Sequence, residues 1–195
     1  MDIFRKFLIY VTAILLTGSV GLAKITGPTR KEATSVIIHS TGGPMCKNNQ
    51  VVFTPSGTLK SMKRYFEQHP TLGIHYLIGR DGTIVKSIPE NHVANHAYGH
   101  NKTSIGIELI NRGNGRDPYL EAQITSLIKL LKEIRKHHNI NIEDIKGHGD
   151  IDSRTFKCGG NRIKQKQDPG ANFPWELLKN ELGRARTLPR ESSVP

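Results

Sequence analysis

Three positions in this chain place a metal-binding residue type where a strand ends or the chain turns. His39 ends a short apolar run, His148 lies within Gly147-His-Gly-Asp-Ile151, and Asp168 opens an Asp-Pro-Gly triplet. Two imidazoles and one carboxylate are a common ligand set for catalytic zinc, which keeps its fourth position for water. An ion bound in this way acidifies that water and makes it a nucleophile. These residue types therefore indicate a hydrolytic zinc site.

Each of the three residues also has an ordinary structural interpretation. A histidine at the end of a buried strand usually makes structural hydrogen bonds, and Asp-Pro-Gly is typical of a turn. The choice between metal ligand and structural residue depends on the sequence around them, and first on the elements that would bring them together.

The first half of the chain predicts strands and one helix. Residues 35–39 are mostly β-branched and are followed by breakers, so they predict a buried strand that ends at His39. Residues 59–68 predict an amphipathic helix. Residues 74–79 and 83–88 predict the two strands of a hairpin around an Asp-Gly turn, followed by a loop over 89–102.

The second half predicts one more strand and two helices. Residues 104–110 alternate in character, which places Glu108 on a face of apolar or absent side chains. Asp117 and Pro118 predict an N-cap and a first helical turn. Apolar residues then recur at helical spacing at Leu120, Ile124, Leu127, Ile128, Leu131 and Ile134. A short helix over 173–182 follows, and this alternation of strands and helices indicates an α/β protein.

The ends and the charge of the chain suggest export. Residues 1–23 have the basic, apolar and small-residue parts of a secretory signal, so we expect a mature protein that begins at Lys24. A retained membrane anchor is the competing interpretation of the same segment. Residues 183–195 predict a disordered basic tail. The formal net charge of +11 favours polyanionic partners, and for an exported protein without a nucleic-acid motif these are cell-envelope polymers rather than nucleic acid.

The chain contains two cysteines, Cys46 and Cys158. In an oxidising compartment they can form a stabilising disulfide, and otherwise they are two free, unrelated thiols. Sequence spacing gives no distance between them, so both interpretations stay open.

Five sequence segments stand out between about residues 35 and 175. They are Val36-Ile-Ile-His-Ser-Thr41; Ile74-His-Tyr-Leu-Ile-Gly-Arg-Asp-Gly82; His96-Ala with Gly99 and Asn101 before Ser104-Ile-Gly-Ile-Glu-Leu109; Gly147-His-Gly-Asp-Ile151; and Lys166-Gln-Asp-Pro-Gly170 followed by Phe173 and Trp175. In this order the five segments resemble the zinc-dependent N-acetylmuramoyl-L-alanine amidases of the second amidase family. This family is related to T7-type lysozyme amidases and to peptidoglycan recognition proteins.

The resemblance implies roles for particular residues. It makes His39, His148 and Asp168 the zinc ligands, Glu108 and Lys166 catalytic, and His96 and Asn101 substrate-binding. A carboxylate near the bound water can take its proton, and an ammonium can stabilise the oxyanion. The ordinary interpretations are a buried salt-bridge partner for Glu108, a solvated charge for Lys166 and a loop hydrogen bond for His96.

Two stretches depart from the family pattern. Residues 153–165 form an insertion rich in Arg, Lys and Gly between the second and third ligands. The insertion contains Cys158, and relatives exist in which a Cys replaces the Asp ligand, which makes Cys158 the rival of Asp168. We select Asp168 because its flanking residues match the motif. The other departure is Asn95, where many relatives carry an aromatic residue.

The resemblance implies a particular fold, reaction and location. We expect a central mixed β-sheet of about five strands flanked by helices, with the zinc site in a surface groove and a catalytic domain over 24–182. We expect hydrolysis of the amide bond between N-acetylmuramic acid and L-alanine in peptidoglycan or muropeptides by a monomer located in the periplasm or secreted. The main alternative is a non-catalytic peptidoglycan-binding protein, followed by a zinc peptidase that cuts within the stem peptide.

Overall fold

The computed structural model describes residues 27–184, so the predicted signal over 1–23 and the residues from 185 onward lie outside the described part of the chain. The strands are β1 (Ser35–Ser40), β2 (Pro44–Lys47), β3 (Gln50–Phe53), β4 (Tyr76–Ile78), β5 (Ile84–Lys86), β6 (Ser104–Leu109), β7 (Ile145–Gly147), β8 (Thr155–Cys158) and β9 (Asn161–Lys164). The helices are α1 (Leu59–Gln68), α2 (Glu121–His137), α3 (His148–Ile151) and α4 (Trp175–Arg184), with a 3-10 turn η1 (Ile142–Asp144).

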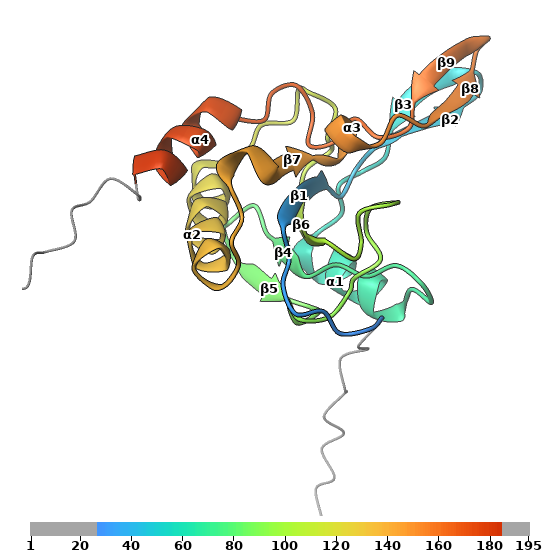
Figure 1. Ribbon diagram of the computed structural model, residues 1–195. Helices are drawn as coiled ribbons and strands as arrows, with labels where there is room; N and C mark the ends of the chain where they lie inside the picture. Colours follow the sequence, from blue (N-terminus) through green and yellow to red (C-terminus); the bar gives the residue numbers. More distant parts are fainter. Residues whose placement is uncertain (1–26, 185–195) are drawn as a thin grey trace, which may run out of the picture.

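The centre of the molecule is a mixed five-stranded sheet in the order β5-β4-β6-β1-β7 (Figure 1). Strands β4, β6, β1 and β7 run parallel, and β5 pairs antiparallel with β4 at one edge. Strands β1 and β6 are buried on both faces, which explains their nearly continuous apolar sequences. The expected mixed sheet of about five strands is confirmed.

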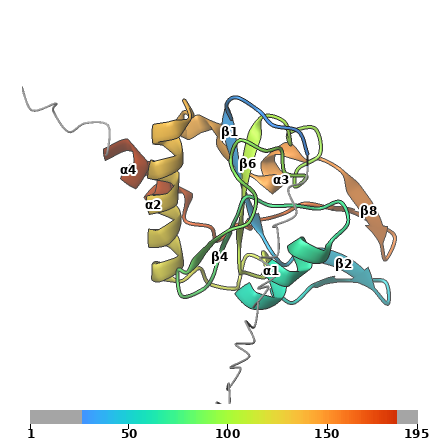
Figure 2. The ribbon, with the colours of Figure 1, turned by 90° about the horizontal axis from the view of Figure 1, so that it is seen from below.

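The two faces of the sheet have different roles. Helices α2 and α4 cover one face, and α1 lies on the other side (Figure 2). The face toward α2 contributes Val36, Ile38, Ile105 and Ile107 to the main core. Each fully buried side chain of this kind stabilises the fold by about 1.5–3 kcal/mol. Because neighbouring residues in a strand point in opposite directions, His39 and Glu108 point away from this core, toward the side of α1.

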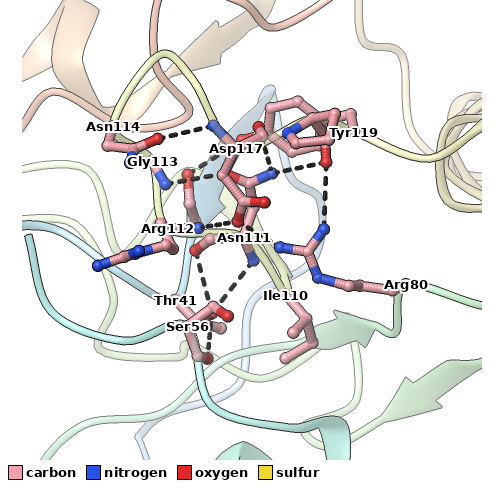
Figure 3. A network of polar contacts seen from close by, with 12 residues as sticks. Thr41, Ser56, Arg80, Ile110, Asn111, Arg112, Gly113, Asn114, Asp117 and Tyr119 are labelled. Atoms are coloured by element: carbon pink, nitrogen blue, oxygen red, sulfur yellow. Dashed lines mark hydrogen bonds and ion pairs between the residues drawn. The ribbon is translucent and has the colours of Figure 1, made fainter.

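The long helix starts later than its sequence signals predict. Asp117 is not its N-cap, because α2 begins at Glu121 and its N-cap residue, Leu120, makes no side-chain capping bond. The Asp117 carboxylate instead accepts the backbone N–H of Arg112 at 2.9 Å and pairs with Arg80 (Figure 3). Leu120, expected on the apolar face, is 43% exposed. The Asp117 carboxylate therefore stabilises the loop before α2 and not the end of the helix.

The same network shapes the loop that follows β6. The amide of Asn111 donates to the carbonyl oxygens of Asp117 at 3.0 Å and Pro118 at 3.3 Å, and it accepts the N–H of Gly113 at 2.8 Å (Figure 3). These bonds fold residues 111–118 into a compact turn, and Tyr119 directly follows that turn.

The predicted hairpin forms with shorter strands than expected, Tyr76–Ile78 and Ile84–Lys86. The N–H of Gly106 donates to the ring Nδ1 of His75 at 2.9 Å, where a longer β4 would offer a backbone carbonyl. This side-chain bond adds to the backbone bond from the N–H of His75 to the carbonyl of Gly106 at 3.2 Å. The predicted helix over 59–68 has the observed bounds of α1.

Two small hairpins, β2–β3 and β8–β9, extend together from the body of the protein (Figure 1). Neither was expected from the sequence, and the second occupies the basic insertion. A disulfide between Cys46 and Cys158 joins them across 112 residues, so the interpretation as two free thiols is wrong. Cys158 is thereby unsuitable as the rival metal ligand. Bridges that close long loops stabilise by about 2–4 kcal/mol.

Within residues 27–184, no helix has both the length and the apolar character that crossing a bilayer requires.

Candidate metal site and active-site cavity

His39 and Glu108 are brought together by the parallel pairing of β1 with β6. The two residues are direct neighbours in the register, so their side chains lie on the same face of the sheet. Both stand near the carboxyl ends of their strands, where ligands bind in open α/β sheets. His148 follows β7 on the other side of β1 and is the first residue of α3. Three adjacent strand ends thus contribute three side chains of the candidate site.

The side chains of His39, His148 and Asp168 converge on one point. The Nδ1 atoms of the two histidines are 2.9 Å apart, and each lies 3.3 Å from Oδ2 of Asp168. In a tetrahedral site with metal–ligand bonds of about 2.0–2.1 Å, ligand atoms lie about 3.3 Å apart. All three residues are buried. The three atoms therefore have the spacing of one face of a tetrahedral metal site.

A hydrogen-bond chain indicates which nitrogen of His39 is free for a metal. The hydroxyl of Ser104 donates its proton to the carbonyl of His100 at 2.7 Å, so its oxygen accepts from Nε2 of His96 at 3.2 Å. The Nδ1 atom of His96 is then an acceptor, and it takes the Nε2–H of His39 at 2.9 Å. This leaves the lone pair of His39 Nδ1 directed at Asp168.

Burial supports the same protonation state. Desolvation lowers the pKa of His39 to about 4, against the opposing effect of Asp168, so the imidazole is neutral near pH 7. Metal ligation requires neutral imidazole and ionised carboxylate. With a lone pair of His39 facing a carboxylate oxygen, a cation between them satisfies both acceptors. The donor chemistry, like the spacing, fits a metal ion.

The absence of a side chain at Gly106 makes room for His96. A Cβ atom at this position would lie 2.6 Å from the ring atoms Cγ and Nδ1 of His96, closer than any real contact. Any larger residue at position 106 would therefore displace the ring that orients His39.

The segment that carries Asp168 is fixed by its backbone. The carbonyl oxygen of Asp168 accepts the N–H of Gly149 at 2.8 Å. The next carbonyl, of Pro169, accepts the hydroxyls of Tyr119 at 2.6 Å and Ser40 at 3.3 Å. The loop before α2 is thus connected to the segment of Asp168 through Tyr119. Sequence reasoning missed Ser40 and Tyr119 as positioning residues, and the only available signal was that Ser40 directly follows His39.

Asp152 lies on the outer side of His148. Its carboxylate Oδ2 is 3.7 Å from His148 Nε2, a ring atom that has no hydrogen-bond partner among the described residues. Arg154 pairs with Asp152 at 2.5 Å. A carboxylate behind a metal-binding histidine favours the tautomer whose other nitrogen faces the metal. At 3.7 Å the contact is electrostatic and not a hydrogen bond, and Asp152, like Ser40 and Tyr119, is a neighbour of the candidate ligands that the sequence did not indicate.

Glu108 occupies an unusual environment for a carboxylate. Its Oε2 atom is buried and has no hydrogen-bond partner within residues 27–184. Burial, assisted by the nearby negative charge of Asp168, raises the pKa of Glu108 to about 8, while the positive charge of Lys166 acts in the opposite direction. A buried carboxyl with its pKa near the working pH is suited to transferring protons.

These groups line one cavity of about 320 Å³. His39, His148, Asp168, Glu108 and Lys166 contribute its polar part. Its apolar wall comes from α1 and the following loop, through Met62, Tyr65, Phe66 and Leu72. A ligand that fills this cavity therefore has both polar and apolar surface.

The remaining two residues singled out from the sequence are not among the three whose ligand atoms converge. His96 lines the cavity, and both of its ring nitrogens face protein groups. Asn101 is not among the residues that line this cavity. Its Oδ1 accepts the N–H groups of His96 at 2.9 Å and Ala97 at 2.7 Å, and its amide donates to Asn95. Asn101 thus holds the loop that carries His96, and its contact with substrate stays a prediction.

Comparison with known protein families gives a match over most of the described chain. The family profile described as N-acetylmuramoyl-L-alanine amidase matches residues 29–171. The N-acetylmuramoyl-L-alanine amidase AmiD of Escherichia coli K12 is 38% identical over 88 residues, which are 42% of this chain and 28% of AmiD. The chain thus matches well under half the length of this relative.

Solved structures with the same fold include two amidases. The amidase LysC of Clostridium intestinale superposes with a TM-score of 0.55 and 30% identity, covering 80% of this chain and 90% of LysC. The E. coli AmiD complex with anhydro-N-acetylmuramic acid-L-Ala-D-γ-Glu-L-Lys superposes with a TM-score of 0.60 and 26% identity, covering 82% of this chain and 60% of AmiD.

Proposed function

Because this chain belongs to the N-acetylmuramoyl-L-alanine amidase family, we propose that it hydrolyses the amide bond between N-acetylmuramic acid and L-alanine in peptidoglycan or muropeptides. The ion we assign to it is zinc, held by His39, His148 and Asp168. The observation that carries this proposal is the convergence of these three ligand atoms beside the buried carboxylate of Glu108 in one cavity. Two imidazoles and a carboxylate at tetrahedral spacing match zinc better than the oxygen-rich sites of magnesium or calcium.

The protein groups around the cavity can carry out each proton transfer of the reaction. When bound, zinc supplies Lewis acidity to the amide carbonyl and to water. Glu108 takes the proton of the attacking water and delivers it to the leaving nitrogen. Lys166 donates hydrogen bonds to the carbonyl oxygen as negative charge develops there. The C–N bond breaks, leaving a lactyl carboxylate on the sugar and a free amino group on L-alanine.

The shape of the cavity supports a muropeptide as the ligand. Its polar side contains the reacting groups, and the Met62 and Phe66 side chains provide an apolar surface opposite them. A lactyl-alanine unit has two methyl groups beside its amide, which matches such a two-sided cavity. His96 fixes the ring of His39 in this scheme, and Asn101 fixes the loop of His96.

Mass spectrometry of soluble muropeptides incubated with the protein tests the activity. We expect free stem peptides with an L-alanine amino terminus, which disappear on chelation and return when zinc is added back. New amino termini within the stem peptide would instead identify a peptidase. Binding without cleavage by the zinc-loaded protein would favour the non-catalytic peptidoglycan-binding alternative.

We further propose that the protein acts outside the cytoplasmic membrane, in the periplasm or as a secreted enzyme. The basic, apolar and small-residue pattern of residues 1–23 and the Cys46–Cys158 disulfide both support export, because disulfides persist in oxidising compartments. Amino-terminal sequencing of the protein recovered from the producing cells is expected to start at Lys24. A chain that retains Met1 would contradict cleavage of a signal.

A further inference from the structure

The β8–β9 hairpin has one cationic face. In its antiparallel register Lys157 lies opposite Arg162, and Lys164 lies opposite Thr155. Because alternate residues of a strand share a face, the three basic side chains stand on the same side of the hairpin. All three are exposed. We call Lys157, Arg162 and Lys164 the cationic hairpin face.

The other face of this hairpin is turned toward the β2–β3 hairpin. It carries Phe156, Ile163 and Cys158, and the disulfide from Cys158 to Cys46 attaches it to β2. The backbone of Gly159 approaches the neighbouring tip closely, since a Cβ atom there would lie 2.4 Å from the carbonyl oxygen of Asn49. The cationic hairpin face is therefore held outward on a cross-linked support.

Within residues 27–184, no carboxylate pairs with these charges. The sequence from 153 to 167 contains no Asp or Glu, and none of the three cations forms an ion pair with another residue of the described range 27–184. Like charges directly opposite each other, as at Lys157 and Arg162, weaken a strand pair. An external anion would relieve this repulsion.

The hairpin lies a few residues from the active-site cavity along the chain. The chain leaves β9 at Lys164 and continues through Gln165 and Lys166, both of which line the active-site cavity. At about 3.3 Å per extended residue, Arg162 is at most about 13 Å from Lys166. The residues that line the cavity of about 320 Å³ do not include Lys157, Arg162 or Lys164. A polymer that extends from the cavity, unlike a ligand confined to it, would offer anionic groups at this distance.

We propose that the cationic hairpin face binds free carboxylates of stem peptides adjacent to the one being cleaved, and so directs the enzyme to polymeric peptidoglycan. This inference rests on the proposed amidase function. The γ-linked glutamate present in the AmiD ligand has a free α-carboxylate, which is the chemistry that exposed Lys and Arg side chains recognise. Repeated stem peptides present such carboxylates in series, which matches three cations on one surface.

The test compares two substrates and two variants. The face variant is Lys157→Glu, Arg162→Glu and Lys164→Glu. The control variant Lys31→Glu, Arg116→Glu and Lys129→Glu makes the same charge change on other surfaces, at exposed residues that form no ion pair within residues 27–184. We expect the face variant to cleave a soluble muropeptide within about twofold of the wild type, but insoluble peptidoglycan roughly tenfold more slowly at low salt. The control variant is expected to keep both rates, and about 1 M salt should remove the difference.

Cosedimentation with peptidoglycan freed of phosphate polymers provides a readout that does not depend on activity. We expect the face variant to lose binding, and we expect wild-type binding to be lost when the carboxylates of the polymer are converted to carboxamides. Unchanged binding to the amidated polymer would overturn the proposal, as would binding only to walls that retain phosphate polymers. An equal loss in the control variant would assign the effect to net charge alone.

Two further outcomes separate this inference from the proposed function. If the wild type cleaves neither substrate, the amidase proposal fails while cosedimentation still tests the cationic hairpin face. If the face variant also loses cleavage of soluble muropeptide, the face acts on the catalytic groups and not on the polymer. A neutral set, Lys157→Gln, Arg162→Gln and Lys164→Gln, repeats the test should the charge reversal fail to fold.

Discussion

Replacing Asp168 with alanine is expected to remove both the metal and the activity. Altering an outer-shell partner of a metal ligand typically costs 10–100-fold in affinity, so losing a direct carboxylate ligand is expected to weaken metal binding by more than roughly a hundredfold. The described residues offer no thiolate as a replacement, since Cys158 is in the disulfide. The measurements are zinc per protein chain by inductively coupled plasma mass spectrometry and the rate of muropeptide cleavage.

Two variants control for effects of Asp168→Ala on folding. Asp168→Asn keeps the shape of the side chain but removes its charge, and it is expected to lose zinc as well. Asp144→Ala removes a carboxylate whose hydrogen-bond partner is Asn141, at a position that does not line the active-site cavity, and it is expected to behave as the wild type. A folded Asp168→Ala protein with one zinc per chain would exclude Asp168 as the third ligand.

Glu108→Gln is expected to slow cleavage without reducing the amount of bound zinc. General acid–base catalysis contributes about 10²–10⁴-fold, and the substitution should slow cleavage by a factor in this range. Zinc content is expected to stay at the wild-type level, because Glu108 is not one of the three converging ligands. The fold is expected to persist, because the buried Oε2 atom has no hydrogen bond to lose within the described residues.

The comparison for Glu108→Gln is Glu143→Gln, an exposed position outside the active-site cavity. Both proteins are assayed with saturating zinc on the same soluble muropeptide. If Glu108→Gln retained more than about a tenth of the wild-type rate, Glu108 would not be the proton-transfer group. Loss of zinc in this variant would instead show that Glu108 supports the metal site.

Local sequence patterns were sufficient to predict the strands that carry His39 and Glu108. The apolar run before His39 and the alternation around Glu108 correctly predicted two buried strands, and strand alternation placed Glu108 on the face opposite Ile105 and Ile107. The start of α2 was predicted wrongly from an equally local signal. Asp117 resembles an N-cap in sequence, but Arg80, which lies 37 residues away, pairs with its carboxylate.

These local patterns could not predict contacts between segments that are far apart in the sequence. The β2–β3 and β8–β9 hairpins were not predicted, and their pairing by Cys46 and Cys158 could not be decided from spacing. The orientation of the His39 ring by His96 depends on the space left at Gly106 across the sheet. The hydrogen bond from the Tyr119 hydroxyl to the Pro169 carbonyl joins loops that are 50 residues apart in the sequence.

The sequence by itself thus determined which residue types stand at strand ends, the α/β alternation and the order of motifs that indicates the family, because these depend on neighbours in the chain. The tertiary structure alone decided that three candidate ligand atoms lie within 3.3 Å of one another, that the Oε2 atom of Glu108 is buried without a partner among the described residues, and that the basic insertion presents its charges outward. Those properties depend on how the sheet brings together segments more than a hundred residues apart, which no local propensity encodes.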